Sequence, residues 1–186
     1  MSRLPAVLSR REFPAAELDA LRLDGEVYRV DDCAVPVDIL ATPGLRATVL
    51  CGQLPDRFIA EQHSAAWVWG AAPHPPVRHE VCSDIVARAR PVLGAPLRIR
   101  EVVLSPADTT SLCGLVLTTP VRTAIDLARS VSRWNEVEAR ILAELMRIGG
   151  FDAVDCARAI NQRRNLPNKL VALDRLAHSD SIEWSA

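Results

Sequence analysis

The chain has 186 residues, a formal net charge of −1 and hydrophobic residues at 49% of its positions. This length suits one ordinary domain or two small units, and this composition is typical of a folded protein rather than a disordered one. The pI of about 6.4 argues against a protein that coats nucleic acid through overall positive charge.

Nothing in the sequence indicates a membrane or secreted protein. No run of about 18 apolar residues is present, so a transmembrane helix is not expected. The first ten residues become charged too early for a signal peptide. The five cysteines are scattered, odd in number and never form CxxC, which favours reduced thiols in a cytoplasmic protein over a disulfide framework.

The first 42 residues predict a helix followed by a two-stranded ribbon. Leucine spacing predicts a helix over residues 14–23, and Gly25 is expected to end it. Alternation predicts strands over residues 26–30 and 33–40, the second an edge strand because it contains Pro36. The helix side chains expected to face inward are Leu18, Leu21 and Leu23.

A helix, a turn and a ribbon in this order form the end of a winged helix, in which the helix enters a DNA groove. Acidic side chains on the predicted helix oppose this interpretation because they repel phosphates. The alternative is a packing or dimerisation module. If the unit binds DNA, the candidate contacts are Arg10, Arg11, Arg22 and Arg29.

The middle of the chain predicts two helices and a small sheet. Thr42 and Pro43 begin a helix that buries Leu45, Val49 and Leu50, and residues 63–70 predict a short helix with Ser64 as its N-cap. Strands are predicted over residues 77–82, 97–104 and 115–117. In the second of these, Leu97, Ile99 and Val103 are expected on one face and Arg98 and Arg100 on the other.

Four helices are predicted after Thr119, which caps the first of them. On that helix Arg122 lies four residues before Asp126 and Arg129 three residues after it, so the three side chains can meet. They form either an ion-pair network that fixes the helix to the sheet or a surface that binds a partner. The inward residues of the second helix are expected to be Trp134, Val137, Ile141, Leu145 and Ile148; those of the last are Leu170, Leu173 and Leu176.

No sequence motif indicates an enzyme, because GxSxG, the P-loop, GxGxxG and HExxH are all absent. His74, His79 and Cys82 have a spacing that permits metal binding, but ordinary loop and strand residues explain them better. A metal-dependent nuclease using Glu80, Asp84 and Glu101 is a third, weaker hypothesis. We therefore expect no catalytic residues, no cofactor and no metal.

Two segments together resemble a known family. Residues 63–70 read HSAAWVWG, and residues 114–129 read GLVLTTPVRTAIDLAR. They resemble the AbiEi-type antitoxins, the antitoxin and transcriptional-regulator half of type IV toxin–antitoxin systems, in their actinobacterial form. Ser64 and Trp67 match the first motif, and Arg122, Thr123 and Asp126 match the polar positions of the second, mostly in structural roles.

The resemblance implies an N-terminal winged helix that binds operator DNA, represses its own operon and opposes a nucleotidyltransferase-like toxin encoded beside it. The winged helix would be shortened here, because little chain precedes Gly25. The alternative is an interaction module that has lost DNA binding, with Arg98, Arg100, Arg122 and Asp126 as the candidate partner contacts. A homodimer is a further expectation.

The expected fold is therefore α/β (α+β), with a small winged-helix-like unit followed by a mixed sheet packed with C-terminal helices. The expected divisions are residues 1–42, the winged-helix-like unit; 43–118, a helix and the sheet; and 119–186, the packed helices.

Overall fold

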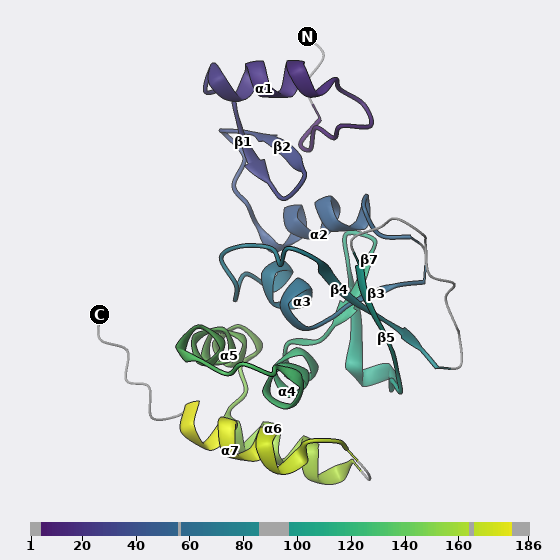
Figure 1. The fold of residues 1–186 in the computed structure, drawn as a ribbon, viewed down its shortest axis with the longest axis vertical. Helices are drawn as coiled ribbons and strands as arrows, with labels where there is room; N and C mark the ends of the chain where they lie inside the picture. The colour runs from purple at the N-terminus through teal and green to yellow at the C-terminus, as the bar shows by residue number, and fades with distance from the viewer. Residues whose placement is uncertain (1–4, 56, 86–96, 164–165, 180–186) are drawn as a thin grey trace. The chain divides into compact units, whose positions relative to one another are not determined.

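The structure of the protein is a computed structural model that describes residues 5–55, 57–85, 97–163 and 166–179 (Figure 1). The chain forms two compact units. One comprises Met1–Asp56 and Ser111–Leu115, and the other comprises Arg57–Thr110 and Val116–Ala186. Helices and two sheets confirm the mixed α/β class, whereas the three-part division stays a prediction.

The first unit begins with the predicted helix and ribbon. Helix α1 (Ala15–Leu23) ends at Asp24, and Gly25 then turns the chain with φ +75°. Strands β1 (Val27–Val30) and β2 (Cys33–Pro36) pair antiparallel, with Val30 opposite Cys33. Leu8 adds a bridge to Ala34 on the ribbon.

A small apolar core joins α1 to this ribbon. Leu8, Leu18, Val27 and Ala34 form it, and Phe13 and Leu21 pack against it. The prediction that Leu23 faces inward is wrong: its side chain is 80% exposed, because it lies at the end of the helix and off the stripe of Leu18 and Leu21. The second strand is also shorter than predicted, since the Ile39 amide turns back to the Pro36 carbonyl at 3.0 Å.

Helix α2 (Pro43–Cys51) completes the first unit. The Thr42 hydroxyl accepts a hydrogen bond from the Leu45 amide at 3.3 Å, which confirms the predicted N-cap. Leu45, Val49 and Leu50 are buried, also as predicted.

A five-stranded mixed sheet in the order β5-β4-β3-β7-β6 lies mostly in the second unit, to which all its strand residues except Ser111, Leu112 and Leu115 belong. Strand β4 (His79–Asp84) runs parallel to β5 (Leu97–Val102) and antiparallel to β3 (Ile59–Ala60), which runs parallel to β7 (Leu115–Thr118). The sequence analysis missed β6 (Thr109–Leu112) and the short helix η1 (Pro106–Asp108), whose residues show no apolar alternation. Strand β5 ends before Val103, so the prediction that Val103 shares a strand face with Leu97 and Ile99 is wrong. The Val103 side chain is largely exposed.

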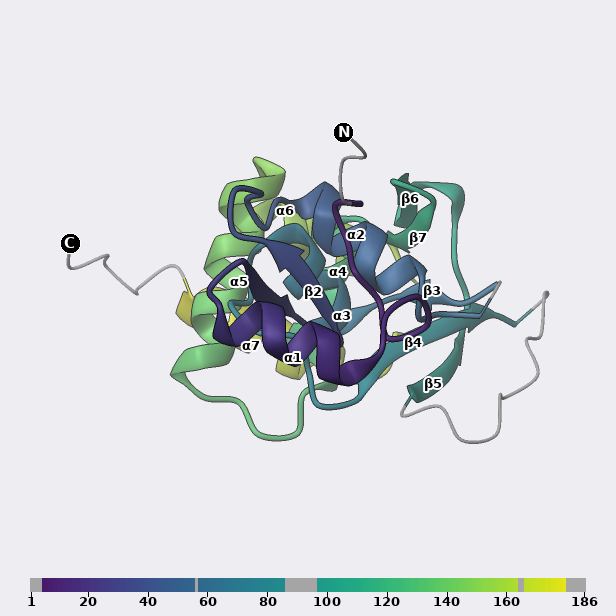
Figure 2. The same cartoon turned by 90° about the horizontal axis from the view of Figure 1, so that it is seen from above.

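Five helices accompany the sheet, and α4 (Pro120–Ser130) is at their centre (Figures 1 and 2). It packs against each of the other four. These are α3 (Gln62–Trp69), α5 (Glu136–Gly149), α6 (Ala153–Gln162) and α7 (Lys169–Ser179). Because helices surround α4, its residues from Arg122 to Ala128 are all buried, including charged ones that a surface helix would expose.

Two helix faces differ from the prediction. Helix α5 buries Ala139, Ile141, Leu142, Leu145 and Met146, and leaves Val137 exposed. Its buried face is therefore rotated from the predicted i, i+4 row. Leu170 on α7 is also exposed, because Ala172 and Leu176 face the core instead. Within the described part of the chain, no helix has both the length and the apolar character needed to cross a membrane.

The end of α5 provides a test of close packing. A Cβ atom on Gly149 would lie 2.4 Å from Cε1 of Phe151 and 3.0 Å from Cβ of Pro120, the first residue of α4. We expect Gly149→Ala to lower the free energy of unfolding by about 1–3 kcal/mol through overpacking. Gly52→Ala is the matched control, since its Cβ would meet nothing nearer than 3.6 Å. Equal urea midpoints for the two variants would contradict this account.

Candidate functional site

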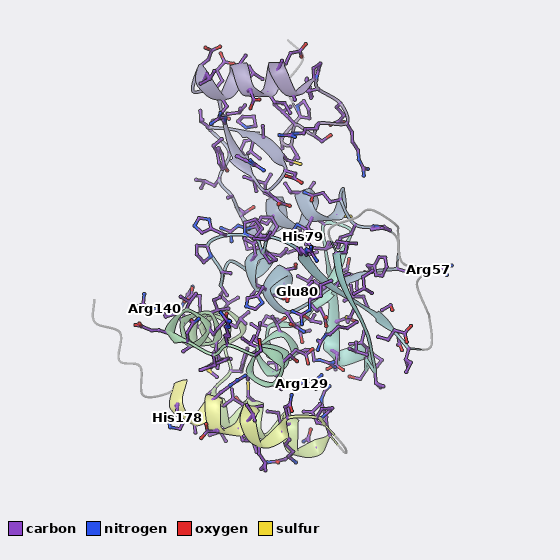
Figure 3. All side chains as sticks on the ribbon, viewed as in Figure 1. Arg57, His79, Glu80, Arg129, Arg140 and His178 are labelled. Carbon is purple, nitrogen blue, oxygen red and sulfur yellow. The ribbon has the colours of Figure 1, made fainter. Side chains whose placement is uncertain are left out.

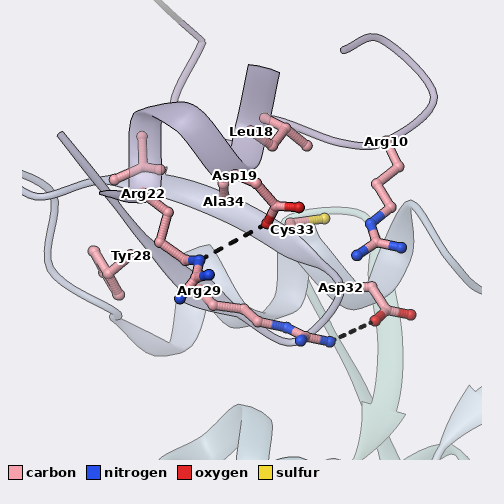
Figure 4. A pocket seen from close by; sticks show the side chains of 10 residues that line it. Arg10, Leu18, Asp19, Arg22, Tyr28, Arg29, Asp32, Cys33 and Ala34 are labelled. Carbon is pink, nitrogen blue, oxygen red and sulfur yellow. Dashed lines mark hydrogen bonds and ion pairs between the residues drawn. The ribbon is translucent and has the colours of Figure 1, made fainter. Parts of the chain in front are cut away.

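Three of the four predicted DNA contacts surround one pocket of the first unit. Arg10, Arg22 and Arg29 line it together with apolar residues of α1, β1 and β2 (Figure 4). The pocket has a volume of about 230 Å³. Arg11 is exposed like the other three but does not line the pocket.

Two carboxylates share this pocket with the arginines. Asp19 lies 3.8 Å from Arg22, and Asp32 lies 3.1 Å from Arg29. All four side chains are more than half exposed, and such ion pairs contribute only about 0–1 kcal/mol. Each arginine can therefore exchange its carboxylate for another anion at little cost.

In the second unit, Arg122, Asp126 and Arg129 meet as predicted. The Asp126 carboxylate accepts hydrogen bonds from Nε of Arg122 and Nε of Arg129, each at 2.8 Å. Nη2 of Arg100 on β5 lies 3.8 Å from the same carboxylate. The Asp126 side chain is only 1% exposed. The contact between α4 and β5 confirms the ion-pair network that fixes the helix to the sheet.

The network continues through three residues that the sequence analysis did not identify: Glu61, Asp108 and Arg163. Glu61 accepts two hydrogen bonds of 2.7 Å from Arg100. Asp108 accepts from Nη1 of Arg122 at 2.9 Å and pairs with Arg163. A local sequence pattern could have identified Asp108, because Ser105 and Asp108 form a capping box with Pro106 between them. Glu61 and Arg163 have no local signal.

Because Arg122 and Asp126 are saturated within the network, a partner could reach them only if the network opened. Arg98 differs, since its side chain is 68% exposed and lies 3.3 Å from the Glu80 carboxylate. The exposure of the Arg100 side chain lies between that of Arg98 and that of the buried pair. The assignment of these four residues to partner binding stays a prediction.

Ser64 is not the N-cap of its helix, so that prediction is wrong. The helix begins one turn earlier, after Glu61, and Ser64 is buried inside it. Its hydroxyl accepts from the Glu80 amide at 2.8 Å and lies 3.2 Å from Nδ1 of His79. His79 and Glu80 are neighbours on β4 (Figure 3). Ser64 thus joins α3 to the sheet.

His63 links three elements of the second unit. Its Nδ1 lies 2.8 Å from Glu80 on β4, and its Nε2 lies 2.9 Å from Glu138 on α5. Burial alone would lower the pKa of this imidazole, but the hydrogen bonds and charges of Glu138 and Glu80 raise it to about 9. The same histidine holds the pKa of Glu80 below its usual range despite burial of that carboxyl. His63 is therefore an imidazolium between two carboxylates at neutral pH.

The residues considered for metal binding do not converge. His79 and Cys82 are three positions apart on β4 and so point to opposite faces of the sheet. Burial, followed by the charge of Glu61, raises the pKa of the Cys82 thiol, which disfavours the thiolate that a metal needs. Among the described residues, no group of three or more His, Cys, Asp and Glu side chains is arranged to hold a metal.

Two carboxylates of the nuclease hypothesis, Glu80 and Glu101, are also separated. Glu80 is directly opposite Arg98, and Ser83 is directly opposite Glu101, in the β4–β5 register. Residues 80 and 83 differ by an odd number, so Glu80 and Glu101 lie on opposite faces. Glu80 is also held by His63 and Arg98.

The buried carboxylate of Asp126 is expected to contribute strongly to stability. Asp126→Asn should lower the free energy of unfolding by about 3–5 kcal/mol, because it removes the carboxylate of Arg129 and leaves Arg122 and Arg100 with one carboxylate each. Glu136→Gln is the control: it removes an exposed partner of Arg140 and should change stability by less than about 1 kcal/mol. Urea unfolding of both variants measures the difference, and a loss below 1 kcal/mol in Asp126→Asn would refute the role of the network.

The His63 contacts predict a pH dependence of stability. The folded pKa of about 9 exceeds the unfolded value of 6.5, so the stabilisation is complete below about pH 6.5 and is lost as pH rises through about 9. The wild-type protein should lose up to about 3 kcal/mol across this range. His63→Gln should show a smaller decline when unfolding is measured at both ends of the range. Parallel curves for the two proteins would contradict the prediction.

One comparison, with a protein-family model, agrees with the resemblance noted in the sequence. No curated protein matches the chain. The crystal structure of the RV2827C protein from Mycobacterium tuberculosis aligns with 94% of this chain and 71% of that one, with a TM-score of 0.49 and 15% identity. Residues 58–148 match the model of the AbiEi antitoxin C-terminal domain. This stretch runs from just before β3 almost to the end of α5 and contains both motifs. Residues 58–148 are therefore similar to the AbiEi antitoxin C-terminal domain.

Proposed function

We propose that this protein is a DNA-binding repressor of the AbiEi antitoxin type that acts in the cytoplasm and regulates its own operon. The observation that carries the proposal is the order of its parts. A helix–ribbon unit with three arginines around one pocket precedes a region similar to an antitoxin domain. In this proposal, residues 1–42 act as a winged-helix-like DNA-binding unit without catalytic activity.

The chemistry of the first unit favours contacts to phosphates rather than to bases. Arg10, Arg22 and Arg29 come from the segment before α1, from α1 itself and from β1, so they can follow a curved phosphate backbone. Asp19 and Asp32 reduce the positive charge, and the net charge of the five side chains is only about +1. Binding should therefore be modest for one copy of the chain, and two copies on a symmetric operator would strengthen it.

The first test is fluorescence anisotropy of the full chain with its own upstream DNA and with a scrambled duplex. The two salt concentrations, about 50 and about 200 mM, span a range over which phosphate contacts lose much of their affinity. Tighter binding to the upstream duplex at both salt concentrations would support a sequence-specific regulator. No binding to either duplex would refute the repressor. It would favour the alternative interaction module, to be tested by pull-down of a nucleotidyltransferase-like product of the neighbouring gene.

Variants that each remove one charge test which side chains contact the DNA. Each of Arg10→Ala, Arg22→Ala and Arg29→Ala should weaken binding and reduce the slope of log K against log salt by about 1. Asp32→Asn should tighten binding by up to about fivefold, because it removes a negative charge beside the DNA. Arg140→Ala is the matched control, an exposed arginine on α5 in the second unit, and should leave both quantities unchanged. Equal effects of Arg140→Ala and Arg29→Ala would contradict the assignment.

A further inference from the structure

A second pocket lies wholly within the second unit. It is formed where β5 ends, η1 begins, α4 starts and α6 ends. Its volume of about 740 Å³ falls within the range of small-molecule sites, roughly 300–1,000 Å³.

Most of its wall is aliphatic. Val103, Leu104, Val121, Ile125 and Ala159 line it. Val103 is 74% exposed although it is a large apolar side chain. An alkyl group in the pocket would remove this surface from water, which favours binding.

The pocket is also lined by charged side chains. These are Arg122, Arg163 and Asp108. The Arg122 side chain is 4% exposed and donates to Asp108 at 2.9 Å, whereas the Arg163 side chain is 28% exposed and pairs with the other oxygen of Asp108. Burial would raise the pKa of Asp108, but the Ser105 amide, Arg163 and Arg122 hold it below its usual range. Two guanidinium groups thus share one carboxylate.

The whole ion-pair network likewise contains more guanidinium groups than carboxylates. Its described members include four guanidinium groups and three carboxylates. They are Arg100, Arg122, Arg129 and Arg163 on one side and Glu61, Asp108 and Asp126 on the other. Arg163 is the most exposed of these four arginines. A monoanion beside Arg163 would balance the network.

We propose that this pocket binds a small organic monoanion with an aliphatic body, such as a medium-chain carboxylate. Its carboxylate pairs with Arg163, whose planar guanidinium can donate two parallel hydrogen bonds. Its alkyl chain lies against Val103, Val121 and Ala159. This site is independent of DNA binding by the first unit.

The test is isothermal titration calorimetry of the full chain with octanoate and, separately, octanol. Octanoate should bind at least about tenfold more tightly, because a hydrogen bond to a charged group contributes about 1.5–3 kcal/mol. Arg163→Gln should remove this preference and leave the octanol affinity unchanged, which also shows that the variant is folded. Arg158→Gln, which changes an exposed arginine of α6 paired with Asp155, should behave as the wild-type protein.

The second variant fills the pocket with a large side chain. Ala159→Trp should abolish binding of both compounds, whereas Ala177→Trp, at an exposed position on α7, should not. The proposal is overturned if octanoate does not bind the wild-type protein, if octanol binds equally well, or if Arg158→Gln and Arg163→Gln lose affinity to the same extent.

Discussion

The second unit depends on one buried carboxylate. Asp126 on α4 accepts from Arg122 and Arg129 of its own helix and lies close to Arg100 of β5. Because α4 is surrounded by four helices, this charge is shielded from water and can be tolerated only with its partners in place. The constraint fixes the orientation of α4 toward the sheet. It explains why the most polar part of the second motif lies in a helix that other helices surround.

How far the sequence predicts this arrangement depends on the range of each interaction. The Thr42 and Thr119 caps and the Arg122–Asp126 contact lie within four residues, so helix geometry alone predicts them. Glu61 and Arg100 are 39 residues apart, and their contact depends on the packing of α3 against the sheet, which no local pattern encodes. Ser64 illustrates the same limit, because its residue type suits an N-cap while tertiary packing places it one turn inside the helix.

The predicted DNA contacts show the same limit of local sequence patterns. Arg22 and Arg29 could be selected because they lie on a helix and on the ribbon that follows it. Their meeting around one pocket with Arg10 required the core of Leu8, Leu18, Val27 and Ala34 to bring those elements together. The sequence could not show that Asp19 and Asp32 each lie beside one of these arginines.

Both pockets pair arginines with fewer carboxylates, but they differ in how firmly the arginines are held. In the first unit the ion pairs are exposed, so their partners exchange readily and salt should weaken any contact to an anion. In the second unit, Arg122 is fixed between Asp108 and Asp126 and is shielded from solvent, while Arg163 remains partly accessible. A surface of the first kind suits a long polyanion, whose many weak contacts add together. A pocket of the second kind suits one small anion, because a rigid, partly desolvated arginine pays less entropy for each hydrogen bond that it forms.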